Sequence, residues 1–266
     1  MPCCKFKGAA TLNKREAIIG ICKRAAELAT AAISGDPSQL IGMPPGQIRD
    51  EILSEGHKWV DLENLTEYCW SHGVPVLHVT KFPKGIRKPH GMLISVHDRP
   101  AIIICKNQKQ PAWLLFILAH ELGHLIAGHV SGDSLIFDSE VTDQVDENDA
   151  EEAVADKNAL AILTGSENRN YRSTTRPHKA SDLAARCHAK GIEDCVYPGH
   201  IVLNYVHGLA GSFHGLGGAA LSALYPNAYA PKILNRCLVK NLNLDELPED
   251  HAEYLMRISG THESLS

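Results

Sequence analysis

Cysteine pairs of the Cys-x-x-Cys type are absent from this chain of 266 residues, although it contains eight cysteines. Zinc ribbons and related thiolate sites are built from such pairs, so the sequence argues against that class of metal site. The cysteines are spread over the whole length, from Cys3 to Cys237. This distribution is typical of reduced, mostly buried thiols in a cytosolic protein.

An excess of positive charge is also lacking. The chain has 26 lysines and arginines against 31 aspartates and glutamates, which gives a net charge of -5. DNA-binding domains usually show a basic excess, so we do not expect direct binding to nucleic acid.

No segment has the length and composition of a membrane anchor or a leader. The N-terminus shows no apolar stretch followed by a small-residue cleavage site. The most apolar stretch, Pro111 to Ala127, is too short to cross a bilayer and contains His120, Glu121 and His124. We therefore expect a soluble, cytoplasmic protein without a membrane partner.

The order of the predicted elements indicates an α+β fold with three regions. Residues 1–56 read as an N-terminal helical extension, 57–165 as the core and 166–266 as a mainly helical C-terminal region. In the core, a β-branched run at Val74–Val79 precedes a hairpin of Met92–Val96 and Ala101–Cys105, with its turn at Asp98-Arg99. We expect this small three-stranded sheet to pack on a helix over Pro111–Ala127.

One motif in that helix carries chemistry. The residues His120-Glu121-Leu122-Gly123-His124 match the pattern H-E-x-x-H. Four residues advance a helix by about 400°, so both imidazoles project from one face and can bind one Zn²⁺. Glu121 points about 100° away and can reach a water molecule at the metal. The competing interpretation is a pair of core histidines that bond to carbonyl groups, but unpaired buried charge is costly and metal binding offsets it.

A third ligand is expected from the helix over Asp149–Leu163. Glu152 and Asp156 are four residues apart and lie on one helical face. Glu152 would bind the metal, while Asp156 would accept a hydrogen bond from a ligand imidazole, as in gluzincins. Glu151 is the competing ligand, and it lies on a different face of the helix.

These residues resemble the ImmA/IrrE metallopeptidase family. The resemblance rests on the segment from His120 to His129 and on Glu152-x-x-Ala155-Asp156, and it covers roughly residues 57 to 165. The chain departs from the family at Asn158, where an aromatic residue is usual, and at Thr164-Gly165, where Met-Pro is usual.

The resemblance implies a zincin-like core and a bacterial or phage cytosolic peptidase. Members of the family typically inactivate a partner protein, a Cro/cI-type repressor or an antitoxin, often by a single cut. Many carry an N-terminal helix-turn-helix domain, but residues 11–55 show no such signature and predict a plain helical extension.

The predicted mechanism is hydrolysis of a peptide bond, with Zn²⁺ as cofactor and Glu121 as the general base. His129 is expected to be structural or to support a ligand. A second oxyanion donor would come from Tyr171, His200, Tyr205 or His207. We expect the substrate to add as a strand along Ala101–Cys105, and the acidic loop over residues 131–147 to attract a basic partner.

Two other functions are compatible with the same residues. The first is a non-catalytic regulator that uses a zincin scaffold to bind a repressor, an antitoxin or DNA. The second is an amidohydrolase that acts on a small molecule. The complete motif favours an enzyme, because a protein that only binds has no need of Glu121.

Overall fold

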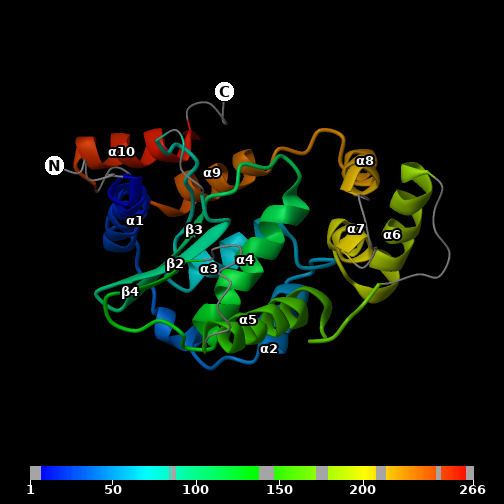
Figure 1. The fold of residues 1–266 in the computed structure, drawn as a ribbon. Helices are drawn as coiled ribbons and strands as arrows, with labels where there is room; N and C mark the ends of the chain where they lie inside the picture. The colour runs from blue at the N-terminus through cyan, green and yellow to red at the C-terminus, as the bar shows by residue number, and fades with distance from the viewer. Residues whose placement is uncertain are drawn as a thin grey trace.

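A computed structural model describes residues 7–83, 85, 88–137, 147–171, 179–207, 214–243 and 247–261. This part of the chain forms an α+β fold, as predicted, in which ten α-helices surround one small sheet (Figure 1). The helices are α1 (Lys7–Ala31), α2 (Pro45–Ser54), α3 (Leu62–Ser71), α4 (Pro111–Ile126), α5 (Glu147–Thr164), α6 (Ala180–Asp194), α7 (Pro198–His207), α8 (His214–Leu224), α9 (Ala230–Asn241) and α10 (Glu249–Ser259). A short 3-10 helix, η1 (Pro37–Leu40), connects α1 and α2.

The sheet has four strands in the order β1-β3-β2-β4, so the prediction of three strands is wrong. The strands are β1 (Val76–His78), β2 (Gly91–Val96), β3 (Arg99–Ile104) and β4 (Ser134–Phe137). The extra strand, β4, lies in the segment predicted as an acidic loop, of which residues 138–146 lie outside the described part. A four-residue strand is too short to show a pattern, and its partner β2 is distant in the sequence.

The position of β3 corrects a second prediction. We predicted that residues 101–105 form an edge strand to which a substrate can add. These residues belong mostly to β3, which lies between β1, its parallel neighbour, and β2, its antiparallel neighbour. Among the described strands, the edges are therefore β1 and β4. Which strand lies at an edge depends on tertiary pairing, which the local sequence does not encode.

The hairpin turn is at His97-Asp98, one residue before the predicted Asp98-Arg99. The register pairs Val96 with Arg99, so only two residues form the loop. Both have positive φ angles, 51° at His97 and 59° at Asp98. Two-residue hairpin loops need this conformation to match the twist of the strands, and His and Asp adopt it more readily than most residues.

Each face of the sheet supplies its own hydrophobic core. Leu93, Ile102 and Ile104 pack in the core shared with α4, whereas Met92 and Ile103 pack in the core shared with α1, α9 and α10. Because side chains alternate along a strand, the same strands build both cores. The sheet is thus the middle layer between α4 on one side and α1 and α9 on the other (Figure 1).

The remaining helices extend the α4 side of the molecule. α5 packs along α4, and α7 packs against α4 from a separate group formed with α6 and α8 (Figure 1). After residue 165 the described residues form α6 to α10, in agreement with the mainly helical composition predicted there. The division into regions at residues 56 and 165 stays a prediction. No helix within the described residues is long and apolar enough to span a membrane.

Candidate metal centre

His120 and His124 lie one turn apart on α4, whose apolar residues belong to the larger core. Their side chains are buried, and only 8% of His120 and 1% of His124 is exposed. Pro111 begins this helix, whose residues are almost all apolar, and Gly128 follows its end with a positive φ of 74°. The two Nε2 atoms are 3.1 Å apart, so both imidazoles point to one location, as the H-E-x-x-H spacing predicts.

Glu152 on α5 supplies a carboxylate at the same location. Its Oε2 lies 3.0 Å from Nε2 of His120, and its Oε1 lies 3.5 Å from Nε2 of His124. The competing Glu151 is exposed and does not join this cluster. The structure therefore brings Glu152, and not Glu151, to the two histidines.

Close contact between α4 and α5 sets this distance. A Cβ atom at Gly123 would lie 2.6 Å from the backbone oxygen of Ala155, closer than side-chain carbons pack. Asn158 adds a hydrogen bond across the same contact, because its Nδ2 donates to the carbonyl of Gly123 at 3.0 Å. Gly123 and Asn158 thus hold the two helices together at the level of the cluster.

The second nitrogen of each imidazole is also engaged. Nδ1 of His120 lies 2.9 Å from Oδ1 of Asp156, the contact predicted for that aspartate. A carboxylate only accepts, so Nδ1 of His120 donates, and the neutral ring then carries its lone pair on Nε2. Nδ1 of His124 lies 2.8 Å from Nδ1 of His129, so His129 supports this ligand, in agreement with one of the roles expected for it.

Electrostatics at the cluster favour a positive charge between the three side chains. Burial alone would lower the pKa of His120, but hydrogen bonds with Asp156 and Glu152 raise it to about 10. Hydrogen bonds with His120 and His124 lower the pKa of Glu152 to about 2, against the opposing effect of burial.

The geometry fits a metal ion. His120, His124 and Glu152 each offer one ligand atom, and these atoms lie within 4.8 Å of one another. In a tetrahedral site with bonds of about 2.0–2.1 Å, neighbouring ligand atoms are about 3.3 Å apart. The shortest contacts are of this size: 3.1 Å between the two Nε2 atoms, 3.0 Å from Nε2 of His120 to Oε2 of Glu152, and 3.5 Å from Nε2 of His124 to the other oxygen, Oε1. This group can therefore hold a metal ion.

Glu121, the predicted general base, is buried beside the cluster with 1% of its surface exposed. Its negative charge contributes to the raised pKa of His120. A Cβ atom at Gly91, the first residue of β2, would collide with Oε1 of Glu121. Sequence reasoning did not identify Gly91, because a lone glycine at the start of a strand carries no signal of what packs on it.

The four candidates for a second oxyanion donor lie in different environments. His200 and His207, both on α7, line a pocket that also includes Asp156. The hydroxyl of Tyr171 donates to Oδ2 of Asp194 at 3.1 Å, which commits it to a structural contact. Tyr205 is buried on α7 and does not line that pocket.

The chain matches no protein-family model, no curated protein and no solved structure.

Proposed function

We propose that the chain is a zinc-dependent endopeptidase with a zincin-like core. The observation that carries the proposal is the convergence of His120, His124 and Glu152 on one location, with Glu121 next to His120 on α4. Two imidazoles and one carboxylate are the ligands of a catalytic zinc site that keeps a position open for water or substrate. Zinc bound there would polarise a carbonyl group and make water more acidic.

Glu121 acts as the general base in this proposal. Its carboxylate accepts a proton from the attacking water and passes that proton to the leaving amine, so the group returns to its starting state. Gly91 leaves room for the carboxylate. Asp156 and His129 fix the two ligand imidazoles through their Nδ1 atoms, so Nε2 of each ring faces the metal position.

The sheet edge supports a peptide as the substrate. Among the described strands, β4 pairs with β2 on one side and has no partner on the other. The register places Phe137 of β4 opposite Met92, next to Gly91, which contacts Glu121. The unpaired backbone groups of an edge strand can bind an extended peptide. This edge favours a peptide over a small amide.

The resemblance to the ImmA/IrrE family adds the class of substrate. On that basis, the substrate is a regulatory protein in the same cytoplasm, a Cro/cI-type repressor or an antitoxin. This assignment of the substrate class depends on the motif H-E-x-x-H and on the pair Glu152 and Asp156.

The substitution Glu121→Gln tests the proposal. We expect the variant to keep one zinc per chain and to cleave a repressor encoded beside its gene about 10²–10⁴-fold more slowly, because only the proton acceptor is lost. The matched control is Glu151→Gln, which changes an exposed acid next to Glu152 and should keep both zinc and activity. Cleavage is followed by mass spectrometry of the products.

Two results would overturn this function. One is cleavage by Glu121→Gln at the wild-type rate. The other is wild-type protein that binds zinc and the repressor but leaves the repressor intact, which would identify a non-catalytic regulator.

A further inference from the structure

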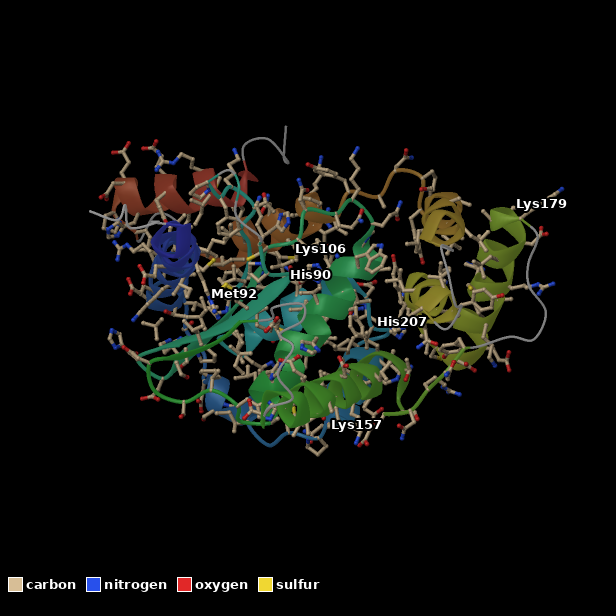
Figure 2. The ribbon with its side chains drawn as sticks, in the orientation of Figure 1. His90, Met92, Lys106, Lys157, Lys179 and His207 are labelled. Carbon is tan, nitrogen blue, oxygen red and sulfur yellow. The ribbon has the colours of Figure 1, made fainter. Side chains whose placement is uncertain are left out.

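A pocket of about 340 Å³ lies between α4, α5 and α7, beside the metal centre. Its apolar walls include Trp113 and Phe116 from α4, Leu160 from α5 and Leu203 from α7. Asp156, which holds the imidazole of His120, also lines it, so the pocket and the metal centre share a residue. His207 lines it from α7, and Figure 2 labels this residue.

His200 is the unusual side chain of this pocket. It is 3% exposed, and neither of its ring nitrogens has a hydrogen-bond partner in the described part of the chain. Its ring stacks on Phe116, with centroids 6.2 Å apart and planes inclined by 15°. The Phe116 ring lies in turn 6.4 Å from that of His120. One aromatic ring therefore separates His200 from a metal ligand.

The protonation state of His200 defines which partner it lacks. Burial lowers its pKa to about 4, so the ring is neutral at physiological pH. A neutral imidazole offers one N–H donor and one nitrogen acceptor. Buried polar groups are almost always hydrogen-bonded, and an unmet one calls for an explanation. Both nitrogens are closed to solvent, so the ring, which lines the pocket, would have to turn to bond to an occupant that carries a hydroxyl group.

The other lining residues narrow the class of occupant. The volume lies at the lower end of ligand pockets, which are about 300–1,000 Å³, and it suits one large side chain. The apolar walls suit an aromatic ring. No lysine or arginine is among the lining residues, so an acidic side chain would find no permanently charged partner there. The polar lining residues besides His200 and Asp156 are Asn170, Asn204 and His207. Asp156, the only carboxylate there, already accepts from His120.

We infer that this pocket receives a tyrosine side chain of the substrate, next to the bond that is cleaved, and that the phenol hydroxyl bonds to His200. The inference rests on the proposed function, because it assigns a substrate residue to the same site. It makes His200 a specificity-determining residue. Phe116 would form the wall between the tyrosine ring and His120.

Binding of small blocked amino acids tests the pocket without any need for cleavage. The probes are N-acetyl-L-tyrosinamide and N-acetyl-L-phenylalaninamide, titrated into the zinc-loaded protein and followed by NMR. We expect the tyrosine probe to bind about tenfold more tightly than the phenylalanine probe, because only the first meets the unpaired imidazole. In His200→Phe the two affinities should be equal within about twofold.

Two control variants show whether the preference for the tyrosine probe arises in this pocket. His188→Phe changes an exposed histidine on α6 and should keep the tenfold preference. Leu160→Trp fills the pocket and should weaken both probes. Equal affinity of the wild type for the two probes, or a preference that survives His200→Phe, would overturn the inference.

A peptide library with tyrosine, phenylalanine, leucine or lysine beside each candidate bond separates this inference from the proposed function. Preferred cleavage at tyrosine that disappears in His200→Phe supports both. Cleavage without a preference for tyrosine overturns the pocket assignment and leaves the endopeptidase intact. If the wild type cleaves no peptide but binds the tyrosine probe through His200, the endopeptidase fails and the pocket stands as a binding site.

Discussion

His120 and His200 are buried histidines on packed helices, with Phe116 between their rings, yet their surroundings have opposite effects. The pKa of His120 is raised to about 10, and that of His200 is lowered to about 4. Burial lowers both values, so it does not explain the difference. The partners do, since Asp156 and Glu152 contact His120, whereas no described residue forms a hydrogen bond with the imidazole of His200.

This contrast separates two functions. A histidine surrounded by carboxylates can bind a cation together with them, and the cation can be a metal. A histidine in an apolar pocket stays neutral and can form a hydrogen bond with a neutral polar group. We therefore assign the metal to the region of His120 and the substrate side chain to the region of His200.

The largest expected effect is the loss of zinc affinity when His120 is removed, and removal of His200 is the comparison. His120→Ala deletes a ligand, so zinc affinity should fall by more than about 100-fold, beyond the 10–100-fold typical for loss of a supporting residue. His200→Phe should bind zinc as the wild type does. Competition with a chromophoric chelator measures both affinities. Weak zinc binding in both variants would contradict the separation of the two regions.

The next effect concerns Asp156, which contacts the metal ligand His120 but is not itself one of the proposed ligands. Asp156→Ala removes the acceptor that fixes Nδ1 of His120, so zinc affinity should fall about 10–100-fold. The same chelator competition measures it, with Glu151→Ala as the control on the same helix. If Asp156→Ala binds zinc as tightly as the control, Asp156 does not position the ligand.

The smallest expected effect is a change in acid stability. Because the folded-state pKa of His200 is about 4 and the ordinary value is about 6.5, the folded protein binds fewer protons. The contribution of His200 to stability is therefore fully present above pH 6.5 and is lost as pH falls towards 4. Between pH 8 and pH 5, the wild type should lose about 2 kcal/mol more than His200→Phe.

Urea unfolding of the metal-free proteins at the two pH values measures this difference. His188→Phe, with its exposed histidine, should behave as the wild type. An equal loss in the wild type and in His200→Phe would show that His200 is not held neutral by burial.

The helical framework and the metal cluster follow from local sequence. His120, His124, Glu152 and Asp156 were predicted from i, i+4 spacing, which α4 and α5 keep, and the contact between the two helices at Gly123 brings the two pairs together. The choice of Glu152 over Glu151 followed in the same way from the face of α5 on which each lies.

Features that depend on contacts distant in the sequence were not predicted. β4 and the interior position of β3 depend on pairing between segments far apart in the chain. The contact of Gly91 with Glu121 depends on how β2 meets α4. His200 was one of four equal candidates, since only the packing of α7 against α4 shows that it lacks a partner.

X-ray absorption spectroscopy of the protein loaded with one zinc per chain tests the central claim most directly. We expect only nitrogen and oxygen neighbours at about 2.0–2.1 Å, with the outer-shell scattering of two imidazoles. In His120→Ala the scattering of one imidazole should disappear. Sulfur neighbours at about 2.3 Å, or a wild-type spectrum that His120→Ala leaves unchanged, would contradict this claim.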